Sequence, residues 1–164
     1  MRKINKHCSF CQGRTQAAAV IDLDNLVNRG PLGPRALLDI TRLAAAFRNH
    51  HVVTGTVCQH WRFRGLSESI WRGLNFDLVA AGANCDRDVS LALIQKFDAG
   101  FRHLILVAGD HGYADLVTLL RKCGAWVEIW TLREAAAYEL VRAADAVRFI
   151  DGLITEVAPP SCAA

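Results

Sequence analysis

Residues 17–25 read Ala-Ala-Ala-Val-Ile-Asp-Leu-Asp-Asn, an apolar run that ends abruptly in acids and an amide. An unbroken apolar run of this length, with no polar alternation, is typical of a strand buried on both faces of a parallel sheet. Asp22 ends the run, and a carboxylate at the end of a wholly apolar strand gains nothing from packing. The stretch therefore predicts an α/β fold with a functional acid at the carboxyl end of its first strand.

Outward from this strand, segments with strand and helix periodicity alternate along the chain, with Gly100 and Gly124 as expected helix ends. Residues 59–73 are aromatic and Arg-rich and show no clean period. The alternation predicts an α/β domain of three layers, α/β/α, with a mostly parallel central sheet whose ligands bind at the carboxyl ends of the strands. Further strands are expected at 52–57, 76–80, 103–108, 126–130 and 147–150, and helices at 35–49, 86–99, 110–123 and 134–143.

Length and composition are those of one compact domain, since the chain has 164 residues, 52% of them hydrophobic and 21% charged. The longest apolar stretches fall far short of the roughly 20 residues that a membrane span needs. The basic first residues lack the apolar run of a signal peptide, so we expect a cytoplasmic protein that does not contact membranes. We divide the chain into a basic N-terminal extension (1–16), one domain (17–151) and a C-terminal tail (152–164).

The net charge of +3 hides an asymmetry, because residues 1–72 carry eleven Arg and Lys against four Asp and Glu. Most of the basic residues of the chain are arginines, whose planar fork of donors matches phosphate geometry. This bias favours a phosphate-bearing partner such as RNA. A solvated basic face without a partner explains the charge equally well.

Acidic side chains gather where the predicted strands end and the next helices begin. Clustered carboxylates repel one another unless a cation lies among them, and hard divalent ions such as Mg²⁺ prefer oxygen ligands. Two such ions about 4 Å apart can stabilise the attacking and leaving oxygens of phosphodiester cleavage. The acids are Asp22, Asp24, Asp86, Asp88, Asp110 and Asp115.

Each acid also has a structural interpretation. Asp86 and Asp110 could cap the helices that they precede, and Asp88 would be favourable in a first helical turn. Asp24 and Asp115 could face solvent. Asp22 is the acid that these explanations fit least, so the set as a whole favours a metal site.

Five segments in order resemble the NYN-domain family of PIN-like ribonucleases. They are Val20-Ile21-Asp22-Leu23-Asp24-Asn25-Leu26, residues 87–93, Leu104-Ile105-Leu106-Val107-Ala108-Gly109-Asp110, residues 116–130 and residues 140–151. The resemblance spans roughly residues 17–151, nearly the whole chain.

The resemblance implies a PIN-like, Rossmann-like fold that cleaves RNA with Mg²⁺ or Mn²⁺. The implied catalytic residues are Asp22, Asn25, Asp88 and Asp110, and the expected metal ligands are Asp22, Asp88, Asp110 and Asp115. The side chains expected to bind RNA are Arg29, Arg62, Arg64, Arg87 and His111. Gly112 departs from the pattern, because the family usually carries a second acid there. Unless Asp115 substitutes for that acid, we expect a weakened second metal position.

Two other functions stay open. A phosphatase of the haloacid dehalogenase type would use Asp22 as nucleophile, Asp24 as acid, Thr54 as its hydroxyl residue and Lys96 as its lysine, although Asn25 stands where that family usually has glycine. A module that binds RNA or protein without cutting would depend on the aromatic and Arg-rich stretch, in which Trp71 is expected in the core more than Trp61.

The six cysteines are expected to be reduced thiols in a cytoplasm. His7-Cys8-x-x-Cys11 supplies only half of a structural zinc site, which needs four ligands. Self-association, or membership of a larger assembly, stays open as well.

Overall fold

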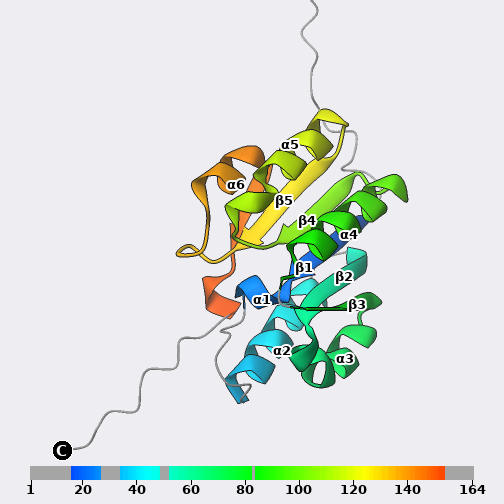
Figure 1. The fold of residues 1–164 in the computed structure, drawn as a ribbon, viewed down its shortest axis with the longest axis vertical. Coiled ribbons are helices and arrows are strands. Elements are labelled where there is room, and N and C mark those ends of the chain that lie inside the picture. Colours follow the sequence, from blue (N-terminus) through cyan, green and yellow to red (C-terminus); the bar gives the residue numbers. More distant parts are fainter. Residues whose placement is uncertain (1–15, 27–33, 49–51, 83, 154–164) are drawn as a thin grey trace, which may run out of the picture.

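The computed structural model describes residues 16–26, 34–48, 52–82 and 84–153. Its centre is a six-stranded sheet in the order β3-β2-β1-β4-β5-β6, in which every neighbouring pair is parallel (Figure 1). The predicted parallel sheet is therefore confirmed. The strands are β1 (Ala17–Asp22), β2 (Val52–His60), β3 (Phe76–Ala81), β4 (His103–Val107), β5 (Trp126–Thr131) and β6 (Ala146–Phe149).

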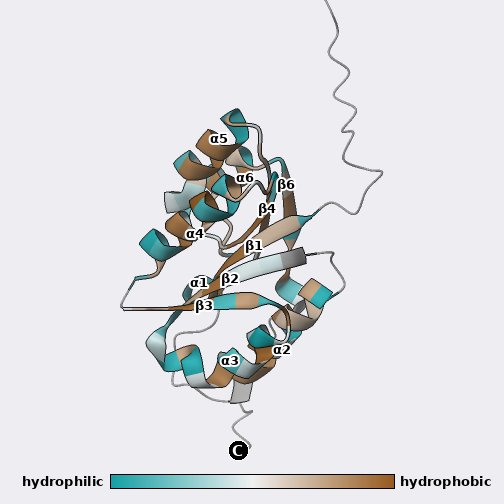
Figure 2. Ribbon diagram, turned by 90° about the vertical axis from the view of Figure 1, so that its right-hand side faces the viewer, coloured by the Kyte–Doolittle hydropathy of each residue, from teal (hydrophilic) through white to brown (hydrophobic). Residues whose placement is uncertain are grey.

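Helices cover both faces of the sheet and complete the three predicted layers (Figures 1 and 2). On one face lie α2 (Pro34–Arg48) and α3 (Arg64–Arg72); on the other lie α4 (Asp86–Asp98), α5 (Ala114–Lys122) and α6 (Tyr138–Ala143). The short α1 (Leu23–Leu26) follows β1 directly, and 3₁₀ turns occur at η2 (Trp61–Phe63), η3 (His111–Tyr113) and η4 (Asp151–Leu153). Over the described ranges, no helix has the length and apolar character to cross a membrane.

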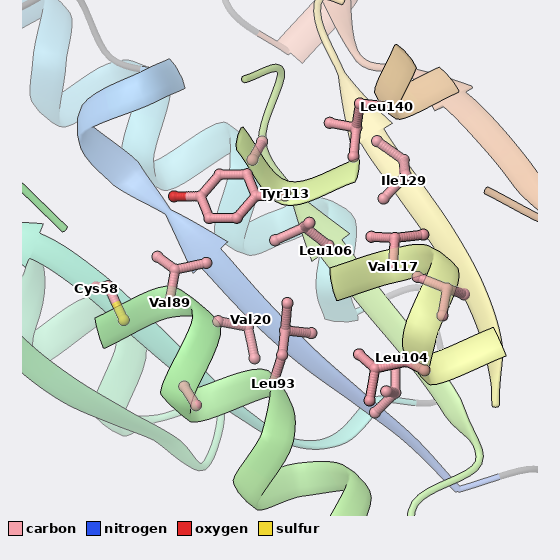
Figure 3. Close-up of a cluster of buried hydrophobic side chains, with 14 of the residues drawn as sticks. Val20, Cys58, Val89, Leu93, Leu104, Leu106, Tyr113, Val117, Ile129 and Leu140 are labelled. Atoms are coloured by element: carbon pink, nitrogen blue, oxygen red, sulfur yellow. The ribbon is translucent and has the colours of Figure 1, made fainter. Parts of the chain in front are cut away.

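The fully buried strand β1 joins the two halves of the core. Ala17, Ala19 and Ile21 belong to the cluster under α2 and α3, whereas Ala18 and Val20 belong to the cluster under α4, α5 and α6. A strand covered on both faces needs apolar side chains in both directions, which explains its unbroken apolar sequence. Figure 3 shows Val20 among side chains of α4, β4 and α5 in the second cluster.

The structure differs from the predicted elements in four places. The helix expected at 110–123 begins only at Ala114, as α5, after the 3₁₀ turn η3. β2 runs to His60, beyond the expected end at 57, because its last residues pair with β3 up to Ala81. Residues 61–72 form η2 and α3, whose pattern was weak because α3 buries only Ser67 and Trp71. α6 begins at Tyr138 and not at 134, since the Ala137 N–H is donated to the Gly109 carbonyl.

Gly109 is held between α1 and the segment that leads into α6. Its N–H donates to Asn25 Oδ1 at 2.8 Å, and its carbonyl accepts from Ala137 N–H at 2.9 Å. A Cβ at this position would lie 2.3 Å from the Ala135 carbonyl oxygen and 2.9 Å from Thr131 Oγ1. The approach of two backbones therefore requires glycine here.

We predict that Gly109→Ala lowers the free energy of unfolding by about 1–3 kcal/mol, because the added methyl group displaces backbone in a packed site. Gly65→Ala is the control, since a Cβ at Gly65 in α3 meets nothing within 4 Å. The control should gain up to about 1 kcal/mol from helix propensity. Urea unfolding measures both, and an unchanged midpoint in Gly109→Ala would contradict the close approach.

Candidate acidic site at the carboxyl edge of the sheet

The carboxyl ends of β1 and β4 lie side by side, because these strands are parallel neighbours in the sheet. Asp22 is the last residue of β1, and Asp110 follows β4 as the N-cap of η3. The predicted placement of both acids at one edge of the sheet is therefore confirmed. The first turn of α4 carries Asp86 and Asp88.

Asp22 is the buried centre of this edge, with 2% of its surface exposed. Its Oδ1 accepts the Asn25 N–H at 3.2 Å, and its Oδ2 accepts the Tyr113 hydroxyl at 2.7 Å. Burial raises the pKa of Asp22, and the charges of Asp24 and Asp86 raise it further, against the opposing effect of the two hydrogen bonds. The carboxylate is therefore held rigidly in surroundings that disfavour its negative charge.

Tyr113 links Asp22 to a second carboxylate. Figure 3 shows its ring among the apolar side chains under α4 and α5. Its hydroxyl lies 2.7 Å from Asp22 Oδ2 and 3.1 Å from Asp86 Oδ1. Burial raises the pKa of Tyr113, so the hydroxyl stays protonated, and its single proton serves one carboxylate at a time. Sequence reasoning missed Tyr113, since an aromatic residue beside a helix start carries no site signal.

Asp24 and Asn25 connect the elements around the site. Asp24 is 6% exposed; its Oδ1 accepts the His60 N–H at 3.0 Å, and its Oδ2 accepts the Cys85 thiol at 3.2 Å. The interpretation of Asp24 as a solvent-facing acid was wrong, because it joins α1 to the end of β2 and the start of α4. The Asn25 amide oxygen accepts from Gly109 N–H and so joins α1 to the end of β4.

The other predicted acids lie around this centre. Asp110 Oδ1 accepts the Gly112 N–H at 2.8 Å, which confirms a capping role at the 3₁₀ turn. Asp88 is half-buried, and its charge adds to burial in raising the pKa of Cys58 to about 12. Asp115 is exposed in the first turn of α5. The interpretation of Asp86 as a helix cap was wrong, because Cys85 occupies the N-cap of α4 and Asp86 lies in its first turn.

Within the described ranges, no three His, Cys, Asp or Glu side chains gather in an arrangement ready to hold a metal ion. Asp22, Asp88 and Asp110 are therefore not found as a ready three-ligand site, and their sharing of one ion stays a prediction. The chemistry of the donors still fits a hard cation, because carboxylate oxygens are what such ions prefer. Asp22 in particular is buried among like charges that a cation would offset.

Four of the predicted RNA-binding side chains are exposed: Arg62, Arg64, Arg87 and His111. Arg62 belongs to η2, directly after β2, and Arg87 to the first turn of α4. The ring of His111 lies 3.2 Å from Asp110 Oδ1. The remaining one, Arg29, lies outside the described residues, as does the half zinc site of His7, Cys8 and Cys11.

The residues expected for a phosphatase are not assembled. Thr54 pairs with Ala18, whereas Asp22 pairs with Cys58, about 13 Å further along β2 at the usual rise per residue. Lys96 Nζ lies 3.4 Å from Thr54 Oγ1, away from the acidic edge. Thr54 lies near the start of β2, which continues to His60 at the acidic edge.

Comparisons with known proteins agree with this geometry. Residues 17–154 match the NYN domain family. A crystal structure of a protein of unknown function from Vibrio parahaemolyticus RIMD 2210633 is similar, with a TM-score of 0.69 and 19% identity over 86% of this chain and 96% of that chain. At that identity the likeness concerns the fold alone, and the comparison with curated proteins finds no match. The match to the family spans the sheet and every acid of its carboxyl edge, so the chain belongs to the NYN family of PIN-like nucleases.

Proposed function

We propose that the protein is a metal-dependent endoribonuclease that cleaves RNA phosphodiester bonds at the carboxyl edge of its sheet. The observation that carries the proposal is Asp22, a carboxylate buried to 2% exposure whose pKa is raised by burial and by the like charges of Asp24 and Asp86. Burying a charge among like charges costs stability. A function at Asp22 explains why this cost is retained.

Mg²⁺ or Mn²⁺ is the proposed cofactor. Asp22, Asp88 and Asp110 are the proposed ligands, with Asp115 as a further predicted ligand and Asp86 added because Tyr113 links it to Asp22. When bound, such an ion polarises a phosphoryl oxygen and lowers the pKa of a water molecule.

The chain's own residues orient the site and attract the substrate. Tyr113 and the Asn25 backbone fix both oxygens of Asp22, while the Asn25 side chain joins α1 to the end of β4. Arg62, Arg64, Arg87 and His111 are proposed to contact RNA phosphates, because cationic side chains offset the repulsion between RNA and the acids. Cys58 and Cys85 are free buried thiols, which suits a reducing cytoplasm, where we propose that the protein acts.

The substitution Asp22→Asn should abolish metal-dependent cleavage of a mixed RNA panel while the fold is kept. Because the folded-state pKa of Asp22 is raised, the wild type loses stability as pH rises through that pKa. The mutant has no such charge. Its melting temperature relative to wild type, measured without metal, should therefore rise between pH 4 and pH 8.

The control for this experiment is Asp98→Asn, an exposed acid in the last turn of α4. Asp98→Asn should cleave RNA at the wild-type rate. The difference between its melting temperature and that of the wild type should not rise between pH 4 and pH 8. Full cleavage by Asp22→Asn would mean that the acids are structural, and RNA binding without cutting would then replace the proposed activity.

A further prediction of the proposed activity concerns Gly112, where the family pattern places an acid. A Cβ at Gly112 meets only Asp110 Oδ1, at 3.5 Å, so an added side chain is accommodated. Gly112→Asp should raise cleavage roughly tenfold, equivalent to about 1.4 kcal/mol off the barrier, and lower the Mn²⁺ concentration for half-maximal rate. Gly112→Asn adds a side chain of similar size without the charge and should give no increase. Equal cleavage rates for Gly112→Asp and Gly112→Asn would show that an acid at position 112 does not contribute to the metal site.

A further inference from the structure

Trp61 is an exposed aromatic side chain at the edge that carries the acidic site. With 61% of its surface exposed, it contrasts with Trp71 and Trp130, which are fully buried. It opens η2, immediately after the carboxyl end of β2, the strand beside β1. A single exposed indole is common on protein surfaces, so exposure alone assigns no role; what distinguishes Trp61 is its position at the carboxyl edge that carries the acids, with an aromatic face open beside them.

Hydrogen bonds tie the turn that carries Trp61 to the site. The His60 N–H donates to Asp24 Oδ1 at 3.0 Å, and the Arg62 N–H donates to His60 Nδ1 at 3.2 Å. The His60 and Trp61 ring centroids are 5.4 Å apart, and the Arg62 guanidinium carbon lies 5.6 Å from the Trp61 ring. The indole is thus held between the His60 ring and the Arg62 guanidinium, and most of its surface stays exposed.

Positive charge continues from this turn along α3. Residues 61–72 contain Arg62, Arg64 and Arg72 against the single acid Glu68. Arg64 and Arg72, both exposed, line a hollow of about 370 Å³ between α3 and β3. Glu68 pairs with both, and Asp77, whose Oδ2 lies 3.5 Å from Lys96 Nζ, lines the same hollow. These two acids offset only part of the charge of Arg62, Arg64 and Arg72. This strip complements a phosphate backbone, which the acids of the neighbouring site repel.

We propose that Trp61, with His60, stacks an unpaired base next to the acidic site, and that Arg62, Arg64 and Arg72 bind the phosphates of the same strand. The ligand is single-stranded RNA, because a base inside a duplex already stacks on its neighbours and cannot offer a face to the indole. This inference rests on RNA being the substrate in the proposed function, but it does not require that the RNA be cut.

The test measures binding of labelled 12-nucleotide RNA, as a single strand and as a duplex, by fluorescence anisotropy in EDTA. Trp61→Ala should weaken binding of the single strand by about fivefold to 100-fold, as expected for loss of one base–aromatic stack. Duplex binding should be weak in the wild type and unchanged in the variant. Trp61→Phe keeps an aromatic ring and should retain most of the affinity.

The matched control is Trp126→Ala, which removes a tryptophan of 48% exposure from the start of β5, at the opposite edge of the sheet. It should bind RNA as the wild type does, and melting temperatures show that each variant is folded. Equal binding by Trp61→Ala and wild type would overturn the inference. So would tight duplex binding by the wild type, or no RNA binding at all, which would favour a protein partner for Trp61.

Cleavage in Mg²⁺, measured on the same variants, separates this inference from the proposed function. Cleavage of single-stranded RNA by Trp61→Ala at the wild-type rate, with unchanged binding, would overturn the stacking inference and leave the nuclease intact. A wild type that binds single strands through Trp61 but never cuts would overturn the nuclease and support the stacking inference.

Discussion

The hydrogen bond from the Tyr113 hydroxyl to Asp22 Oδ2, 2.7 Å long, is the contact on which the arrangement of the site depends. It joins the end of the most buried strand to the turn before α5, and the same hydroxyl reaches Asp86 at the start of α4. Three elements that are far apart in sequence are thereby fixed around one carboxylate. Because Tyr113 is anchored in the apolar cluster, the position of Asp22 is set by the core and not by a flexible loop.

Gly109 supports the same edge from the other side. Asn25 and the segment before α6 both bind its backbone, so α1, the end of β4 and the entry to α6 share one tight junction. Packing and site geometry are coupled here, because the Asn25 side chain lies beside the proposed metal site and also holds α1 against the end of β4. A change at this junction should therefore affect stability and site alignment together.

The sequence predicted the fold wherever one element carried its own signal. The apolar run of β1 and the acid that ends it were sufficient to place Asp22, because a strand covered on both faces leaves no other explanation for the pattern. Contacts between distant segments carried no such signal: the pairing that extends β2 to His60, the burial of Asp24 and the role of Tyr113 all depend on partners elsewhere in the chain. The proximity of Asp86 to Asp22 was likewise not predictable, because it depends on the Tyr113 hydroxyl that contacts both.

The central claim is that Asp22 is a buried carboxylate built to bind a divalent cation, and calorimetric titration with Mn²⁺ tests it most directly. The account predicts saturable binding by the wild type at pH 7, and its loss in Asp22→Asn, whose fold is intact. Retained Mn²⁺ binding in Asp22→Asn would show that Asp22 is not a ligand of the ion. No binding by the folded wild type would contradict the claim outright.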